Sequence, residues 1–321
     1  MKKIKFSVFL LLIFLNQMVL PESANIGLKI NHIQFVGSHN SYKQAMPEGF
    51  IKQLMKVNPN LVESLEYEHV PLTEQLDLGI RKLELDIFYV ADEGQFTVGH
   101  VQQIDMNSNC STLRICLNQI IAWSQNNPTH VPIWISFNAK DGYIFGLPTP
   151  ETFSPIAFSL MDSVIEEILG KKLIRPRDIV DLQWPLLKEA RGKFILILDE
   201  GGSKRDMYYK DWQQRPMFTN APEGHPAAAI MIINDPIGQL HEIQRLVRAG
   251  YMVRTRADAD TREARENYLG RRDAAFASGA QAISTDYYLP ATHFGNEYQV
   301  SLPQPFQCNP ITAPKTCKVP E

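Results

Sequence analysis

The 321-residue sequence has only four cysteines, little charge imbalance and, beyond its first twenty-odd residues, no long apolar run. A formal net charge of -3 gives no reason to expect a nucleic-acid partner, and it argues against tight docking on anionic membranes by charge alone. No later segment is apolar enough over sufficient length to cross a membrane. No low-complexity linker divides the chain, so one large core can form, and nothing implies an obligate protein partner.

Several motifs of other protein classes are missing as well. No Gly-x-Gly-x-x-Gly turn follows any apolar run, which counts against a doubly wound open sheet with a phosphate turn. The sequence has no Gly-x-Ser-x-Gly elbow, so nucleophilic catalysis by serine has little support. Closely spaced cysteine pairs with histidines beside them are lacking too, which makes zinc a poor candidate.

The first residues have the order of a secretory signal peptide. A basic start precedes an apolar run over 6–15, and Pro21-Glu22-Ser23-Ala24 supplies a small-residue exit. The run is too short to span a bilayer comfortably, although an uncleaved N-terminal anchor is the competing interpretation. We predict a signal peptide over 1–24, export to the periplasm or the medium, and one domain over 25–321.

An even number of cysteines in an exported chain suggests disulfides. Cys110 with Cys116, and Cys308 with Cys317, are local pairs that would each close a small loop, although the sequence alone leaves the connectivity open. After Pro290 the chain becomes polar and proline-rich and carries two of the cysteines. We interpret this part as a C-terminal tail that is pinned to the domain by a disulfide.

Apolar runs of strand length alternate with helical patterns along the domain. The predicted strands cover 33–36, 82–89, 131–137, 193–198, 228–233, 252–255 and 281–285. The predicted helices cover 72–78, 113–125, 155–168, 182–191, 238–249 and 261–277. This alternation favours an α/β fold with a parallel sheet inside a layer of helices. Seven candidate strands fit a (β/α)₈-like TIM barrel, regular or irregular, with a doubly wound open sheet as the alternative.

In such a barrel the active site lies at the carboxyl ends of the strands. The first strand runs into His39-Asn40, and in the second Glu84 and Asp86 share one face because strand side chains alternate. Two carboxylates side by side on a buried strand would repel each other, and a bound divalent cation would remove that penalty. The alternative is a solvated edge strand with ordinary surface carboxylates. Oxygen ligands suit calcium, or less readily magnesium, better than zinc.

A second histidine follows a short run that turns back from the carboxylate strand. This run covers 96–99 and is followed directly by His100. The turn before it could return His100 to the end of the barrel that holds His39. Two histidines that flank a cation can exchange protons near neutral pH, one as the base and the other as the acid.

The later strand ends add polar and charged side chains, namely Asn138, Lys140, Asp199, Arg254, Arg256, Asp258 and Asp286. Cations that face one end of a barrel suit a phosphate, because a guanidinium binds its oxygens bidentately. Each of these residues alone could form an ordinary ion pair. Their coincidence at strand ends favours one joint site.

The order His39-Asn40, Glu84-x-Asp86, His100 resembles that of the TIM-barrel superfamily of phosphoinositide phospholipases C and glycerophosphodiester phosphodiesterases. Over nearly all of the mature chain the sequence is similar to the exported calcium-dependent phosphatidylinositol-specific phospholipases C of bacteria and fungi. The blocks that carry this similarity are 37–43, 253–258, 278–281 and 284–288. The similarity is specific in these blocks and loose between them.

The resemblance implies that the inositol 2-hydroxyl attacks the phosphodiester, which releases diacylglycerol and forms a cyclic inositol phosphate. It assigns His39 as the general base or a phosphate ligand, and His100 as the acid that protonates the diacylglycerol oxygen. Asn40, Glu84 and Asp86 would hold Ca²⁺, and Asn138 stands where the family often has a glutamate ligand.

The remaining strand-end residues are expected on the substrate side. Lys140, Arg254 and Arg256 would bind phosphate or inositol, and Asp199 would contact the substrate or orient a histidine. Asp258 and Asp286 belong to the same predicted set. The implied partner is a phospholipid at a membrane or micelle surface. The alternatives are a glycerophosphodiester or lysophospholipid phosphodiesterase, and a lipid- or inositol-binding relative without turnover, which only Asn138 favours.

Overall fold

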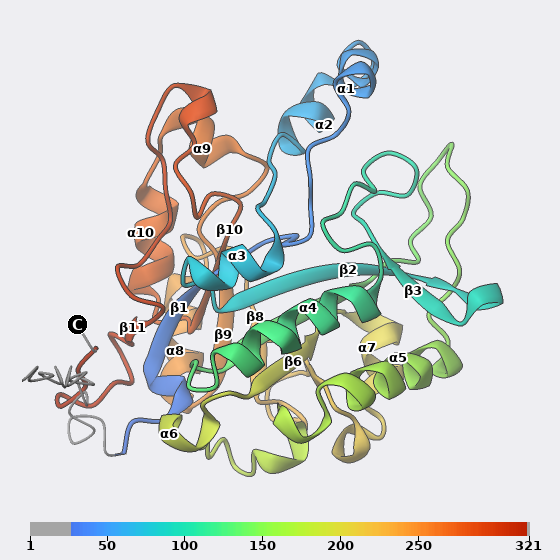
Figure 1. Ribbon diagram of the computed structural model, residues 1–321. Helices are drawn as coiled ribbons and strands as arrows, with labels where there is room; N and C mark the ends of the chain where they lie inside the picture. The colour runs from blue at the N-terminus through green and yellow to red at the C-terminus, as the bar shows by residue number, and fades with distance from the viewer. Residues whose placement is uncertain (1–26, 320–321) are drawn as a thin grey trace, which may run out of the picture.

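A mostly parallel sheet, curled into a barrel, forms the centre of the protein (Figure 1). The computed structural model describes residues 27–319, so the predicted signal peptide lies outside the described residues. The parallel strands are β1 (Ile33–Ser38), β2 (Lys82–Val90), β4 (Ile133–Ala139), β5 (Leu173–Ile174), β6 (Phe194–Leu198), β7 (Phe218–Thr219), β8 (Ile230–Ile232), β9 (Met252–Arg256) and β10 (Ala282–Thr285). Each of the seven predicted strands corresponds to one of these.

The barrel is irregular where it would close. The strands follow the order β5-β6-β4-β2-β1-β10-β9-β8, and β7 shares with β5 the outer edge of β6. Among the described residues no strand pairing joins β7 to β8. Instead the side chain of Asn220, directly after β7, accepts a hydrogen bond from Ile232 N at 3.1 Å. The predicted TIM-barrel-like fold is confirmed in this open form.

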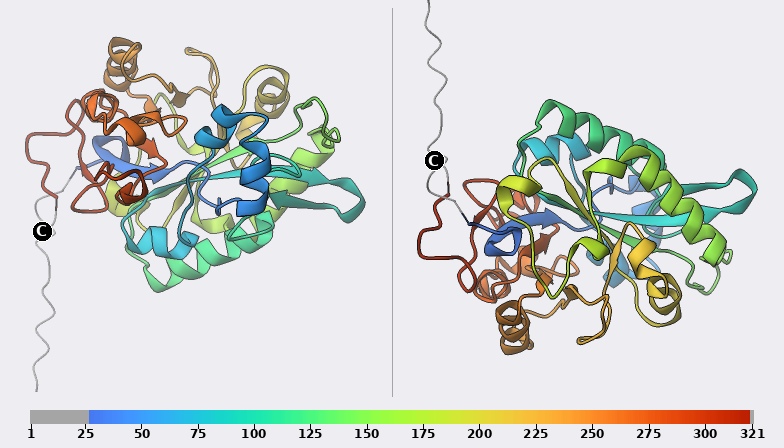
Figure 2. Two further views of the ribbon diagram at one scale, coloured as in Figure 1. Left: turned by 90° about the horizontal axis from the view of Figure 1, so that it is seen from above. Right: turned by 90° about the horizontal axis from the view of Figure 1, so that it is seen from below.

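Helices cover the outside of the curled sheet (Figure 2). The helices are α1 (Glu48–Leu54), α2 (Pro59–Ser64), α3 (Leu72–Asp77), α4 (Leu113–Asn126), α5 (Pro155–Ile168), α6 (Leu187–Ala190), α7 (Gly202–Tyr209), α8 (Leu240–Ala249), α9 (Arg262–Glu266) and α10 (Gly270–Ala277). Of these, α1 and α2 project away from the sheet (Figure 1). Local sequence sets several ends. Thr112 and Ser154 cap the amino ends of α4 and α5 with their side chains. Gly250, with φ of 101°, ends α8 in the left-handed conformation.

Two helix predictions need correction. The helix predicted over 261–277 is divided into α9 and α10, because Asn267 adopts a left-handed conformation with φ of 50°. The helix predicted over 182–191 is wrong for its first half. Leu182 has φ of 56°, and Trp184 Nε1 donates a hydrogen bond to Gly250 O at 2.8 Å, so tertiary contacts hold this segment in an irregular path.

Polar and charged side chains gather inside the barrel toward the carboxyl ends of the strands, and the buried Lys82 lies at the level of the apolar Trp134 below them. Trp134 is fully buried and pairs in register with Lys82, whereas Asp86 pairs with Asn138 farther along. A Cβ atom at Gly37 would lie 2.3 Å from the Cβ of Lys82, so only glycine leaves room for this buried lysine. The outward residues of β2, such as Leu85, pack in the core beneath the helices. The polar end of the barrel, at the carboxyl ends of the strands, is called the mouth below.

The C-terminal tail lies on the barrel as predicted, but its disulfide joins two residues of the tail itself, so strand pairing and hydrogen bonds attach it. The structure contains both local disulfides, Cys110–Cys116 and Cys308–Cys317. β11 (Gln307–Cys308) pairs antiparallel with β1, and Asn309 Nδ2 donates to Gly279 O at 2.6 Å. Over residues 27–319 no helix has the length and apolar character needed to span a bilayer.

We expect acid to weaken the fold through His130. Burial lowers the pKa of His130 from 6.5 to about 4, and its ring bonds Ser124 Oγ and Val131 O. Between these pH values the unfolded chain binds a proton that the folded chain excludes. The free energy of unfolding should therefore fall as pH drops from 6.5 to 4, by about 3 kcal/mol from this residue. Urea unfolding at several pH values will measure this slope.

The variant His130→Gln should show a smaller slope than the wild type. The exposed His241, on α8, provides a matched control, and His241→Gln should leave the slope unchanged. Equal slopes in the wild type and His130→Gln would contradict the prediction.

Candidate active site

Two carboxylates of β2 meet at the mouth. Glu84 and Asp86 point into the barrel, and both are buried. Asn138, at the end of β4, bridges them, because its Nδ2 lies 3.2 Å from Glu84 Oε1 and 2.8 Å from Asp86 Oδ1. The structure therefore brings together three of the four residues that the sequence predicts as metal ligands.

Three cations, two on strands and one directly after β4, occupy the opposite oxygens of these carboxylates. Glu84 Oε2 accepts from Arg254 at 2.9 Å and from the buried Lys82, and Asp86 Oδ2 accepts from Lys140 at 2.8 Å. Burial opposes ionisation of Glu84, but Lys82 and Arg254 outweigh it and hold the pKa of that carboxyl well below its usual range. Each carboxylate thus has one oxygen bound to a cation and a second oxygen that faces Asn138.

His39, directly after β1, lies on one side of this pair. Its Nδ1 is 2.8 Å from Asp286 Oδ1, and its Nε2 is 3.6 Å from Glu84 Oε1. Arg256 contacts the other oxygen of Asp286 at 3.4 Å. Burial first, and then the charge of Arg256, lower the pKa of His39, so the ring is neutral near pH 7. Nδ1–H then donates to Asp286, and the lone pair of Nε2 faces the carboxylates.

His100 lies on the other side, with the same kind of support. It follows the antiparallel strand β3 (Gln95–Val98), and Gly99 N donates to Asp86 O at 3.2 Å. Its Nδ1 is 3.1 Å from Asp105 Oδ2, and the buried Lys43 Nζ binds Asp105 Oδ1 at 3.2 Å. Both histidines therefore direct Nδ1 to a buried carboxylate that a cation holds in place, and Nε2 of His39 faces Glu84.

The remaining predicted residues differ in position. Asp199 Oδ2 lies 4.0 Å from Arg254 NH1, at the edge of the site, and burial raises its pKa. Asp258 has no exposed surface. It accepts hydrogen bonds from Asp286 N and Tyr298 OH, so it holds the backbone of Asp286 in place. The sequence predicted that Asp258 would bind substrate at the mouth, but its side chain is fully buried.

Sequence reasoning missed three charged residues of the site. Lys82 begins β2, and strand alternation places it on the same face as Glu84. Its hydrogen bond with the Glu84 carboxylate could not be predicted from the sequence. Lys43 and Asp105 come from separate loops and meet only in the folded chain. No local pattern marks such a pair.

The donor set at the mouth fits a calcium ion. Asn40 Oδ1 is buried and has no hydrogen-bond partner, while its Nδ2 donates to Tyr67 OH. Rotating the amide of Asn138 by half a turn would present its oxygen next to Glu84 and Asp86. Within residues 27–319 no group of three or more His, Cys, Asp or Glu side chains is arranged for a metal, so amide oxygens must complete the set. Carboxylate and amide oxygens are the ligands that Ca²⁺ prefers.

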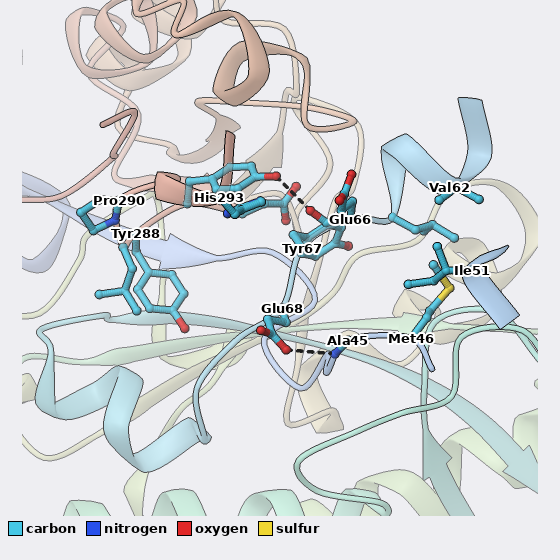
Figure 3. Close-up of a pocket in the computed structure, with 14 residues that line it drawn as sticks. Ala45, Met46, Ile51, Val62, Glu66, Tyr67, Glu68, Tyr288, Pro290 and His293 are labelled. Atoms are coloured by element: carbon cyan, nitrogen blue, oxygen red, sulfur yellow. Dashed lines mark hydrogen bonds between the residues drawn. The ribbon is translucent and has the colours of Figure 1, made fainter. Parts of the chain in front are cut away.

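Two hollows flank this polar centre. The one on the His39 side has a volume of about 360 Å³ and reaches Asp286. Figure 3 shows it between the segment with Met46, Ile51 and Val62 and the segment with Tyr288 and Pro290. The hollow on the other side, about 240 Å³, is lined by His100 and Lys140. The mouth thus offers a charged centre between two partly apolar walls.

Known proteins share this arrangement of strands. A family model described as phosphoinositide phospholipase C, Ca²⁺-dependent, matches residues 28–99 and 91–310. A calcium-dependent phosphoinositol-specific phospholipase C from Pseudomonas sp. superposes with a TM-score of 0.61 at 17% identity, covering 89% of this chain and 96% of its own.

A Ca²⁺-dependent phosphatidylinositol-specific phospholipase C from Streptomyces antibioticus gives a TM-score of 0.54 at 17% identity, covering 86% of this chain and 100% of its own. The phosphatidylinositol-specific phospholipase C of Listeria monocytogenes gives 0.52 at 14% identity, over 80% and 89% of the two chains. At these identities the structures support the fold. No curated protein sequence matches significantly.

Proposed function

Because the chain belongs to the Ca²⁺-dependent phosphoinositide phospholipase C family, whose members are phosphoric diester hydrolases, we propose that it cleaves phosphatidylinositol to diacylglycerol and a cyclic inositol phosphate. The observation that carries this proposal is the pair of histidines, each fixed by a buried aspartate, on either side of Glu84 and Asp86. A protein that only binds lipid has no need for two such proton-transfer groups.

His39 acts as the base. Its neutral ring accepts the proton of the inositol 2-hydroxyl at Nε2, and the hydroxyl oxygen attacks phosphorus. Asp286 receives the Nδ1–H bond and compensates the positive charge that the ring gains. Arg256, next to Asp286, keeps that carboxylate ionised and in place.

His100 acts as the acid. Its protonated ring donates from Nε2 to the diacylglycerol oxygen as the bond from phosphorus to that oxygen breaks. Asp105 accepts the Nδ1–H bond, and Lys43 fixes Asp105. Water can then open the cyclic product by the reverse roles of the two histidines.

Asn40, Glu84, Asp86 and Asn138 would hold Ca²⁺, which when bound neutralises charge on the phosphoryl oxygens. Arg254 and Lys140 border the same space and can contact phosphate oxygens with their remaining N–H groups. The substrate arrives on a membrane or micelle surface. The two disulfides suit an oxidising compartment, in line with export by the predicted signal peptide.

The test is turnover of phosphatidylinositol in mixed micelles by the mature protein, followed by phosphorus NMR. We expect a cyclic inositol phosphate signal with Ca²⁺ present and its disappearance after a chelator is added. No turnover of phosphatidylinositol, phosphatidylcholine or a glycerophosphodiester would refute the proposal and favour a lipid-binding protein without turnover.

A further inference from the structure

The segment that follows β4 exposes apolar side chains next to His100. In this segment, residues 142–150, Tyr143, Ile144 and Phe145 are 65%, 45% and 92% exposed. Phe145 is almost fully exposed to solvent, whereas Ile144 is partly buried. Exposed apolar runs of this kind mark sites that contact a membrane or another molecule.

The base of the 142–150 loop is held firmly, so its tip projects in a defined direction. Asp141 accepts hydrogen bonds from Phe153 N at 3.0 Å and from Lys204 Nζ at 2.9 Å. On the far side of the loop, Glu151 accepts from Ala91 N at 3.1 Å. The tip itself closes with Leu147 N donating to Ile144 O.

The loop also forms a wall of the hollow that contains His100. Ile144 and Leu147 line this hollow together with His100 and Lys140. On the proposed function, on which this inference rests, His100 protonates the diacylglycerol oxygen. The apolar wall therefore lies on the side where the lipid part of the substrate leaves.

A second apolar tip lies at the same end of the barrel. Val57, in the turn between α1 and α2, is 82% exposed, and Met55 is 42% exposed. Figure 1 shows α1 and the segment between β4 and α5 both projecting from the upper part of the molecule, beyond the carboxyl ends of the strands. Two separated apolar tips beside one mouth suit a flat, apolar layer better than a peptide groove.

We propose that the 142–150 loop inserts Phe145 into the acyl layer of the membrane that carries the substrate, which holds the diglyceride end against the His100 side of the mouth. An aromatic ring at the lipid boundary contributes apolar contact without charge. The net charge of -3 supplies no attraction to anionic lipid, so the binding should depend little on salt.

The experiment measures binding of the mature protein to sucrose-loaded phosphatidylcholine vesicles by co-sedimentation, with EDTA present. Phe145→Ser should weaken vesicle binding by about tenfold or more. Val180→Ser is the matched control, because Val180 is likewise an exposed apolar residue, at 65%. It lies in the turn that Gln183 N closes by donating to Val180 O, next to Trp184. Trp184 is held to Gly250, two residues before β9, at the opposite end of the barrel. The control should bind like the wild type. Equal binding by Phe145→Ser, or no binding by the wild type, would overturn the inference.

A second measurement separates this inference from the proposed function. Both Phe145→Ser and the wild type should cleave a soluble, monomeric short-chain phosphatidylinositol at equal rates, because no membrane is involved. Loss of activity on that substrate in Phe145→Ser would overturn the anchoring role, since it would place Phe145 in the chemistry. Absence of turnover by the wild type would count against the proposed function alone, while vesicle binding would still test the loop.

Discussion

His39→Ala and His100→Ala should each lower kcat on phosphatidylinositol by about 10²- to 10⁴-fold, the usual contribution of a positioned general acid or base. Without His39 the 2-hydroxyl has no acceptor at Nε2, and without His100 the diacylglycerol oxygen leaves unprotonated. Both side chains lie at the mouth and are 16% and 21% exposed, so the test includes a check that each variant is folded. Initial rates in mixed micelles at saturating Ca²⁺ will measure the effect.

Thermal unfolding should show that both variants remain folded. His241→Ala, on the exposed surface of α8, is the matched control and should keep wild-type activity. If His39→Ala or His100→Ala retained near wild-type turnover, the assigned role of that histidine would be wrong. Free imidazole should restore part of the lost rate where a proton transfer alone is missing.

Seven of the nine parallel strands could be predicted because they form buried apolar runs, whereas β5 and β7, with two residues each, are too short to leave a pattern. Runs such as that of Leu83 and Leu85 are apolar on the outward face and leave an unmistakable period of two in β2. The first helix after β1 could not be predicted, because α1 has no buried residue and thus no amphipathic pattern. At 182–191 the helical pattern was present, but the contact of Trp184 with Gly250 prevailed over it.

The site divides in the same way. Residues at strand ends, such as Glu84 and Asn138, could be predicted to meet, since parallel strands end at one edge of the barrel. The role of the loop residue Asp105 could not be predicted, because only the tertiary structure brings it next to His100 and Lys43. The sequence also suggested that a metal ion relieves the repulsion between the carboxylates. The structure shows that the cations of the chain already do part of this.

The composition of the metal site leads to the second large effect. Two carboxylates, Glu84 and Asp86, stand against three cations, Lys82, Lys140 and Arg254, within direct contact. The fourth ligand that we propose is the neutral Asn138, where the resemblance leads us to expect a glutamate. Calcium affinity rises with the number of anionic ligands, so we infer that this site binds Ca²⁺ weakly for its family.

Asn138→Glu should therefore bind Ca²⁺ about a hundredfold more tightly, because it adds a carboxylate where positive charge exceeds negative charge. Lys140, partly exposed beside Asp86, can turn to meet the new carboxylate, so the added charge does not remain buried and unpaired. Isothermal titration with Ca²⁺ in the absence of lipid will measure the affinity without reference to turnover. Gln125→Glu, an exposed charge change on α4, is the control and should bind like the wild type. Unchanged affinity in Asn138→Glu would mean that this position does not contact the ion, and the amide rotation assigned to Asn138 would then be wrong.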